Sequence, residues 1–314
     1  MKALIIGAAG FVGKFLISHL LEEGWDVSAT RLPSETLDAD VPIYELDILA
    51  PPDIDAILEK VGPDCIFHLA AQSSVEASWK QPALTADINI KGAVNLLEAV
   101  RKMQKPPRVL LIGSGEEYGY ILPEELPIRE DTPLRPGNVY AATKIAQGML
   151  GQIYARAYGL EIVIVRAFNH AGPGQTDTFV LPEFCKQAAM IEAGLSPPVI
   201  KVGNLEVKRD FTDVRDIVRA YRLLAEKGES GSVYNVGSGK AVSIGELLEK
   251  ILALSNTEIA IEQNPLRMRL SDTPVIEADI SRIYEQTGWK PEIPMESTLA
   301  DILDEWRERA KRGK

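Results

Sequence analysis

Three glycines follow the first apolar run of the chain, and this arrangement constrains the fold more than any other feature. Lys2–Ile6 is typical of a short buried strand, and Val12–Glu23 has the apolar spacing of a helix. Glycines in such a turn permit the tight bend, let backbone N–H groups approach a pyrophosphate, and let the helix pack on the strand. An ordinary turn would not need three glycines, so the spacing GxxGxxG predicts a dinucleotide-binding turn. Its residues are Gly7, Ala8, Ala9, Gly10, Phe11, Val12 and Gly13.

The same alternation of an apolar run with an amphipathic segment continues along the chain. It is the pattern of parallel βαβ units, and it predicts an α/β fold with one Rossmann-type doubly wound parallel sheet. Two long helical segments are expected over Ala83–Met103 and Tyr140–Tyr158. The expected strands are Lys2–Ile6, Asp26–Thr30, Ile43–Glu45, Cys65–Leu69, Val109–Ile112, Glu161–Val165 and Val233–Val236.

The regular pattern fades after Arg166, where proline, glycine and polar residues become frequent. We therefore expect a dinucleotide-binding domain over residues 1–168 and a smaller C-terminal α/β lobe, mainly residues 169–314, that binds substrate. Segments near 210–240 and 274–290 are expected to return to the first domain. The substrate should lie between the lobe and the sheet.

The charge and cysteine content exclude several classes of partner. The 314 residues carry a net charge of −11, which argues against nucleic acid or an anionic membrane surface as a partner. No apolar stretch approaches the length of a membrane span. Cys65 and Cys185 lie far apart, which suits a reducing cytoplasm, and the three scattered histidines give no metal-binding spacing. An anionic ligand must therefore be held by a few local cations.

The end of the second strand bears on the choice of cofactor. An NAD site usually carries an acidic residue there for the ribose 2′-hydroxyl, whereas this chain has Arg31. Arg31 can pair with a 2′-phosphate, so NADP(H) is favoured and NAD(H) stays possible. Asp47, after the third strand, is a candidate acceptor for the adenine amine. A solvated arginine and a plain turn aspartate are the competing interpretations.

Tyr140 and Lys144 lie four residues apart, on one face of a predicted helix. None of the other eight tyrosines has a lysine at this spacing. A neighbouring ammonium and an oxidised nicotinamide would lower the phenol pKa and allow proton exchange with a sugar oxygen. Ser114, after the strand Val109–Ile112, ends at the carboxyl edge of the sheet and can hold that oxygen. The competing interpretation is that Tyr140 and Lys144 form an ordinary side-chain pair on the surface of a helix.

With these residues the chain resembles the extended short-chain dehydrogenase/reductase family, also described as the NAD-dependent epimerase/dehydratase family, over nearly its whole length. His68–Ser73 resembles the segment that passes the nicotinamide half of the cofactor, and Asn89 with Gly92 resembles the feature that orders the active-site lysine. Arg166–Pro173 is similar to the entry into the substrate lobe. The cofactor contacts this implies are Gly7, Gly10, Phe11, Val12, Gly13, Arg31, Asp47, Ile48, Leu69, Ala70, Ala71, Tyr140 and Lys144.

Within the family, the chain is most similar to enzymes that act on GDP-linked 6-deoxyhexoses. The resemblance implies reduction of the 4-keto group of GDP-4-keto-6-deoxy-D-mannose to GDP-D-rhamnose, with Ser114, Tyr140 and Lys144 as the triad. It also implies substrate contacts, with Asn169 at the diphosphate–sugar region, Arg209 and Arg269 on the diphosphate, Asp272 on the ribose hydroxyls, and Val180, Phe184 and Lys186 along the base pocket.

Alternative functions remain open at this point. A 4,6-dehydratase needs an acid and a base beside the triad hydroxyl. Gly115 can be neither, but Glu116 stands where such dehydratases keep their base, so a GDP-mannose 4,6-dehydratase is the leading alternative. A nucleotide-sugar 4-epimerase follows, although epimerases usually hold NAD. A protein that only senses a dinucleotide is the non-enzymatic alternative. The two long helices carry surplus apolar surface, and family members pair through them, so a homodimer is expected.

Overall fold

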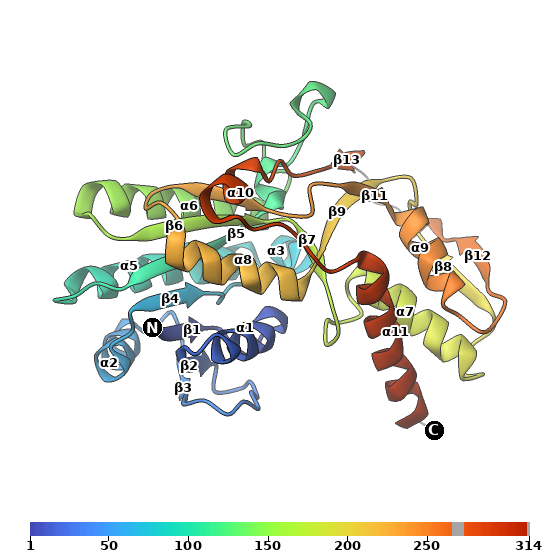
Figure 1. The fold of residues 1–314 in the computed structure, drawn as a ribbon, viewed down its shortest axis with the longest axis horizontal. Coiled ribbons are helices and arrows are strands. Elements are labelled where there is room, and N and C mark those ends of the chain that lie inside the picture. Colours follow the sequence, from blue (N-terminus) through green and yellow to red (C-terminus); the bar gives the residue numbers. More distant parts are fainter. Residues whose placement is uncertain (266–272, 313–314) are drawn as a thin grey trace.

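A seven-stranded sheet forms the centre of the N-terminal part of the chain (Figure 1). The structure, a computed structural model, describes residues 1–265 and 273–312. All neighbouring strands of this sheet run parallel, in the order β10-β6-β5-β4-β1-β2-β3. Their bounds are β1 (Lys2–Ile6), β2 (Asp26–Arg31), β3 (Ile43–Glu45), β4 (Cys65–His68), β5 (Arg108–Ser114), β6 (Ile162–Ala167) and β10 (Val233–Val236). The predicted doubly wound sheet is confirmed.

The direction of chain winding reverses between β1 and β4, which are hydrogen-bonded neighbours. Parallel strands end together at one edge, and ligands of such sheets bind where the strand order reverses. The glycine turn follows β1 there, and Leu69 follows β4. The topology therefore places the glycine turn at the crevice expected for a ligand.

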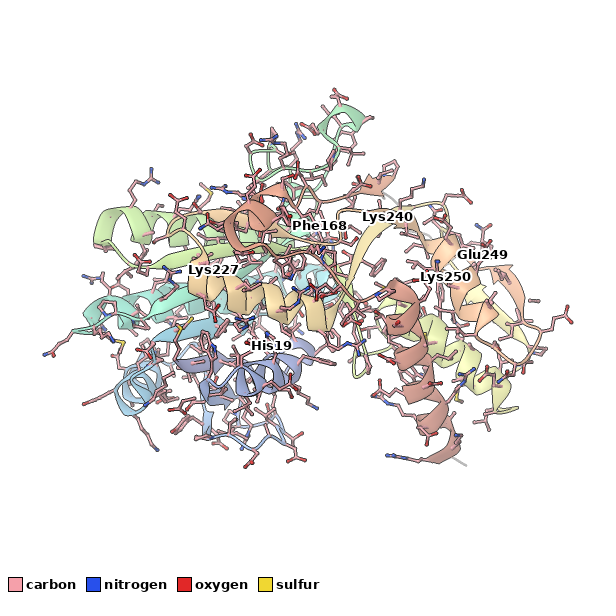
Figure 2. The ribbon with its side chains drawn as sticks, viewed as in Figure 1. His19, Phe168, Lys227, Lys240, Glu249 and Lys250 are labelled. Atoms are coloured by element: carbon pink, nitrogen blue, oxygen red, sulfur yellow. The ribbon has the colours of Figure 1, made fainter. Side chains whose placement is uncertain are left out.

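Helices cover both faces of the sheet, and each face has its own hydrophobic core. On one face α1 and α8 pack together over the strands; on the other, α2, α5 and α6 do so. These helices are α1 (Phe11–Glu22), α2 (Pro51–Val61), α5 (Gly92–Lys102), α6 (Val139–Tyr158) and α8 (Val214–Lys227). His19, labelled in Figure 2, lies on α1 and accepts a hydrogen bond from Arg222 of α8 at 3.2 Å.

The expected long helix over Ala83–Met103 is divided in three. It consists of α4 (Pro82–Ala86), one π-helical turn η1 (Asp87–Lys91) and α5. A π-helical turn inserts an extra residue into the helix and is frequent at functional sites. Asn89 lies in this turn, completely buried. The apolar periodicity does not reveal such an insertion.

A second, smaller lobe packs beside the carboxyl edge of the sheet and has its own core (Figure 1). Its strands form a sheet in the order β11-β9-β13, with β7 paired to β9, and a separate pair, β12-β8. The strands are β7 (Asn169–Ala171), β8 (Val199–Val202), β9 (Lys208–Asp213), β11 (Ala241–Ser243), β12 (Ala260–Gln263) and β13 (Val275–Ile276). The helices of this lobe are α7 (Val180–Glu192), α9 (Ile244–Ala253) and α11 (Met295–Arg312).

The chain crosses between the two parts more than once. After β9 it returns to the large sheet as α8 and β10, and later α10 (Ser281–Thr287) packs on both of them. Shorter elements lie near the junction: α3 (Val75–Lys80) and the two 3₁₀ turns η2 (Gly115–Tyr118) and η3 (Pro123–Glu125). Within residues 1–265 and 273–312, no helix combines the length and the apolar character that a membrane crossing requires.

Candidate active site

The glycine turn has no room for side chains at two of its three glycines. Gly7 has a φ of +82°, and a Cβ there would lie 2.6 Å from the Cα of Ala70. A Cβ on Gly13 would lie 2.6 Å from the carbonyl carbon of Ala8. On Gly10 it would meet only the backbone oxygen of Gly7, at 3.6 Å. Gly7 and Gly13 are thus required by the fold, whereas Gly10 keeps the start of the helix open.

The N-terminus of α1 suits an anionic group. Gly10 caps the helix without a side-chain hydrogen bond, and the first turn carries no acidic residue. Unpaired N–H groups and the helix dipole favour negative charge at such an end. Phe11 stacks on His170 of β7, with ring centroids 6.2 Å apart and an interplanar angle of 5°, and Val12 packs on the core. These residues fit the pyrophosphate of a dinucleotide.

The segment after β4 lies directly against the glycine turn. The backbone N–H groups of Leu69 and Ala70 both donate to the carbonyl of Ile6, each at 2.9 Å, and Ala71 follows half-buried. Ile48 is buried against Gly92, where a Cβ would approach its Cγ2 to 2.8 Å. Asp47 is exposed and accepts a hydrogen bond from the Leu49 N–H at 2.9 Å. Asp47 is therefore more accessible to an adenine than Ile48.

Arg31 stands at the end of β2 with its guanidinium already engaged. Its Nη1 donates to three backbone carbonyls of the following loop, and its Nη2 pairs with Glu45 at 2.9 Å. A 2′-phosphate at this position would compete with the Glu45 carboxylate for the guanidinium. The sequence did not reveal this pairing, because Glu45 lies on the neighbouring strand. The role of Arg31 in cofactor choice stays a prediction.

Ser114, Tyr140 and Lys144 come together at the carboxyl edge of β5. Ser114 ends that strand, while Tyr140 and Lys144 occupy the first turns of α6, which packs on β5 and β6. Tyr140 is 8% exposed and Lys144 3%. The phenol of Tyr140 shares a hydrogen bond with Ser114. Lys144 Nζ donates to the carbonyl of Ile112 at 2.8 Å and to Gln147 Oε1 at 3.0 Å. The three predicted residues are thus neighbours.

Burial controls the ionisation of both groups on α6. It raises the pKa of Tyr140 above the ordinary value of a phenol, against the opposing effect of the Ser114 hydrogen bond. Burial lowers the pKa of Lys144 to about 8, and the Glu117 carboxylate acts in the opposite direction. The expected lowering of the phenol pKa by Lys144 is thus corrected, because desolvation of the phenolate dominates. Tyr140 therefore stays protonated at neutral pH.

Asn89 supports α6 one residue before Lys144. Its Nδ2 donates to Thr143 Oγ1 at 2.9 Å and to the Gln72 carbonyl at 3.0 Å, and its Oδ1 accepts from the Gln72 N–H at 2.9 Å. Asn89 therefore ties α6 to the segment after β4. His68 is buried nearby, and burial together with Lys144 lowers its pKa to about 3, so its ring is neutral.

Two adjacent glutamates follow Ser114 in different environments. Glu116 is exposed, and its Oε2 accepts a hydrogen bond from Asn138, the N-cap residue of α6, at 3.2 Å. Its charge contributes to the raised pKa of Tyr140. Gly115 lies over the ring of Phe168, which a Cβ would approach to 3.2 Å. Phe168 lies at the junction of the two parts, as Figure 2 shows. Glu116 is thus a carboxylate beside the phenol.

Glu117 is a site residue that the sequence analysis did not single out. It is 1% exposed, its Oε1 accepts from the Ser114 N–H at 2.8 Å, and its Oε2 pairs with Arg166 Nε at 2.8 Å. One signal was present in the sequence: Arg166 follows the apolar run Ile162–Val165 on a buried strand. A charged residue inside a buried strand needs a charged partner.

The lobe places two of the expected diphosphate contacts on adjacent strands. Asn169 begins β7, exposed and opposite Phe211 of β9, and Arg209 lies two residues before Phe211. Arg209 Nη1 donates to the carbonyls of Lys208 and Thr273, at 2.9 and 2.8 Å. Arg269 and Asp272 lie outside the described residues.

Lys186, one of the three residues expected along the base pocket, borders a surface cavity. Lys186, on α7, lines a surface cavity of about 300 Å³ and pairs with Asp177 at 2.7 Å. Phe184 is 2% exposed in the core of the lobe, and Val180 packs against the same core. Phe184 faces the interior because it lies on the buried side of α7, and its contact with a base stays a prediction.

Comparisons with known proteins agree on one family. Residues 4–302 match the family described as GDP-mannose 4,6 dehydratase. The chain is 36% identical to the GDP-6-deoxy-D-mannose reductase of Pseudomonas aeruginosa over 310 residues, which cover 99% of this chain and 98% of that protein. It is 29% identical to GDP-mannose 4,6 dehydratase 1 of Arabidopsis thaliana, covering 99% and 91% of the two chains.

Solved structures show the same architecture. The structure of RMD from Pseudomonas aeruginosa complexed with NADPH superposes with a TM-score of 0.89 at 34% identity, covering 98% of this chain and all of that one. UDP-glucose 4-epimerase from Thermotoga maritima gives a TM-score of 0.87 at 28% identity, covering 98% and 99%. The sheet, the glycine turn, the Ser114–Tyr140–Lys144 group and these matches together show that the chain belongs to the GDP-mannose 4,6-dehydratase family of extended short-chain dehydrogenases/reductases.

Proposed function

We propose that this protein reduces the 4-keto group of GDP-4-keto-6-deoxy-D-mannose to give GDP-D-rhamnose, with NADP(H) preferred and NAD(H) possible. The observation that carries the proposal is the Ser114–Tyr140–Lys144 group at the sheet edge, in which Tyr140 and Lys144 are buried and Ser114 is partly buried. It occurs in a chain 36% identical to a GDP-6-deoxy-D-mannose reductase over nearly its full length. The preference for NADP(H) is supported by Arg31 and by the NADPH in the structure of the Pseudomonas RMD.

The N-terminal part holds the dinucleotide in this proposal. The open helix end at Gly10 would receive the pyrophosphate, and Leu69 to Ala71 would border the nicotinamide half. Asp47 would accept from the adenine amine, while Arg31 would exchange Glu45 for the 2′-phosphate. When bound, the reduced nicotinamide supplies the hydride. Every other part of the reaction falls to side chains of the chain itself.

Tyr140 supplies the proton. Its phenol is protonated at neutral pH because burial disfavours the phenolate, so it can donate to the O4 atom of the keto-sugar as the carbonyl is reduced. Ser114, hydrogen-bonded to Tyr140, orients the same oxygen. The ammonium of Lys144, one helical turn away, then faces the phenolate that remains and stabilises it.

The lobe residues are proposed as substrate contacts. Arg209 and Arg269 would neutralise the diphosphate, Asn169 would bind the diphosphate–sugar region, and Asp272 would bind the ribose hydroxyls. Lys186 would contact the base from its cavity, and Val180 would line the same base pocket. These cations matter because the chain has a net charge of −11 and must attract a dianionic ligand locally.

A GDP-mannose 4,6-dehydratase is the second candidate, favoured by the exposed carboxylate of Glu116 beside Tyr140. Dehydration removes the C5 proton, for which Glu116 is a suitable base, but it also needs an acid for the departing C6 hydroxyl. Gly115 lies where such an acid would follow Ser114, and it has no side chain. Epimerisation and cofactor sensing without turnover have no comparable observation in their favour.

The substrate experiment separates these activities. We would incubate the pure protein with GDP-mannose, with GDP-4-keto-6-deoxy-D-mannose plus NADPH, and with UDP-glucose, and identify the products. NADPH consumption with the keto-sugar alone, giving GDP-D-rhamnose, is the expected result. Loss of water from GDP-mannose without added cofactor would instead identify a dehydratase, and UDP-galactose formation an epimerase.

We also propose a homodimer that works in the cytoplasm. Met149 and Ile153 on α6 are 56% and 47% exposed, and Trp79 on the adjoining α3 is 62% exposed. Large apolar side chains grouped on one surface are typical of an interface. Both cysteines are free and buried, which is compatible with a reducing compartment. Light scattering at micromolar concentration should give twice the chain mass; a monomer would contradict the proposal.

A further inference from the structure

The buried carboxylate of Glu117 joins the catalytic serine to a second buried network. Its Oε1 accepts from the Ser114 N–H, at the last residue of β5, and lies so close to Gly113 that a Cβ there would collide with it. Its Oε2 is paired with Arg166 Nε at 2.8 Å. Both oxygens therefore have fixed partners.

Arg166 is itself held on several sides. Its Nη1 donates to the Tyr118 hydroxyl at 3.0 Å and to the Glu130 carbonyl at 3.1 Å, and its guanidinium lies 4.9 Å from the Tyr118 ring centre. The Tyr118 hydroxyl donates to Asn235 Oδ1 on β10 at 2.6 Å. The carboxylate of Glu117 thus cannot move without disturbing β5, β6 and β10 together.

Charged and titratable groups face Lys144 and Tyr140 from several elements. Glu116 and Glu117 come from η2, His68 from β4 and Tyr221 from α8, with Arg166 of β6 behind Glu117. His68 is neutral, and burial raises the pKa of Tyr221, which is also neutral. Among these groups, Glu117 is the charged residue that opposes the effect of burial on the pKa of Lys144.

We propose that Glu117 is a positioning residue that fixes the Ser114 backbone and supplies the buried negative charge that keeps the Lys144 ammonium protonated during turnover. Its role in turnover rests on the proposed reduction, whereas its electrostatic role is a property of the protein alone. Arg166 holds the carboxylate in place. Burial raises the pKa of Glu117, whereas the Arg166 guanidinium and the Ser114 N–H act in the opposite direction and favour the ionised carboxylate. The ordinary alternative is a structural ion pair without influence on the catalytic group.

The direction of the effect follows from its sign. Removing a buried anion makes protonation of neighbouring groups less favourable, so the pKa values of both Lys144 and Tyr140 fall. Reduction requires both groups protonated, so activity is lost as pH rises past the lower of the two values. The alkaline limb of the pH profile should therefore move to lower pH when Glu117 loses its charge. A purely structural role would lower the rate at all pH values without moving this limb.

Glu117→Gln is the direct test, because glutamine keeps the shape and removes the charge. We would titrate Lys144 by NMR with ¹³C-labelled lysine in the protein without ligands, assigning its signal with Lys144→Arg. The wild-type signal should titrate near pH 8. We expect the variant to titrate roughly one pH unit lower, and the alkaline limb of kcat to move with it. An unmoved Lys144 titration would overturn the proposal, whatever the substrate proves to be.

Breaking a buried ion pair can prevent folding, so a second variant removes both partners. Glu117→Gln combined with Arg166→Gln leaves no stranded charge. We expect a smaller downward shift of the Lys144 titration, because removing the Arg166 cation acts in the opposite direction. Glu117→Asp keeps the charge but shortens the reach to Ser114, so kcat should fall about tenfold with the Lys144 titration in place. Glu192→Gln breaks the Glu192–Arg307 pair of the lobe and should change neither kcat nor the Lys144 titration. A Lys144 titration that stays near pH 8 in the double variant would also overturn the proposal.

Discussion

Two lysines on two helices show how differently the sheet domain and the lobe treat charge. Lys144 on α6 is 3% exposed and is bound to a backbone carbonyl and to Gln147. Lys186 on α7 has a side chain that is 41% exposed and is paired with an equally exposed Asp177. Because Lys144 is buried, its charge depends on fixed neighbours. The ammonium of Lys186 is partly exposed, so exchanging Asp177 for another anionic partner costs little free energy. The group proposed as catalytic is thus formed before any ligand binds, whereas the lobe offers contacts that a ligand can replace.

The strongest test of the group proposed as catalytic is Tyr140→Phe. It removes the proton donor and leaves the packing, so kcat should fall about 1,000-fold, measured by NADPH oxidation with the keto-sugar. NADPH binding, followed by fluorescence, should persist. Tyr154→Phe on the same helix is the control, since its hydroxyl donates to Glu98 of α5 at 2.7 Å. Near-normal turnover by Tyr140→Phe would show that Tyr140 is not the proton donor.

Arg209→Ala should have the next largest effect and should act on binding. Loss of a charge-assisted contact to the diphosphate should raise KM for the keto-sugar about 10- to 100-fold with little change in kcat. Lys208→Ala, at the adjacent exposed position of β9, is the matched control and should leave KM nearly unchanged. A fall in kcat at constant KM would instead show that Arg209 acts in the chemical step and not in substrate binding.

Arg31→Ala tests whether the partly engaged guanidinium can still choose the cofactor. We expect the KM for NADPH to rise about tenfold while the KM for NADH stays the same, since only NADPH carries the 2′-phosphate. Arg101→Ala, an exposed arginine on α5 paired with Glu98, serves as the control. Equal effects on the two cofactors would mean that Arg31 only orders the loop after β2.

The smallest effect is expected for Lys186→Ala. An exposed ion pair contributes about 0–1 kcal/mol, so the free energy of unfolding should hardly change, and KM for the GDP-sugar should rise a few-fold if the base lies in this cavity. Lys250→Ala, labelled in Figure 2 and paired with Glu296 on the same lobe, has similar exposure and is the control. The same KM for both variants would remove Lys186 from the substrate site.

The sequence predicted the fold well because each prediction rested on local periodicity. The expected strands recur within two residues of the observed ones, since apolar runs bounded by turns mark buried parallel strands. Gly7 and Gly13 were also identifiable from local sequence, because few structures other than a dinucleotide-binding turn place glycines at this spacing directly after a strand. The π-helical turn at Asp87–Lys91 was not, because one inserted residue hardly alters a stripe of apolar side chains.

The residue types and spacings by themselves determined the doubly wound sheet, the glycine turn and the identity of the tyrosine–lysine pair, because each depends on neighbours within one helical turn or one strand. Only the tertiary structure decided which charges face one another. It paired Glu117 with Arg166 and Arg31 with Glu45, turned Phe184 into the core, and left Tyr140 more strongly protonated than its lysine neighbour suggested. Ionisation and pairing depend on desolvation and distance across elements, and these exist only once the chain is folded.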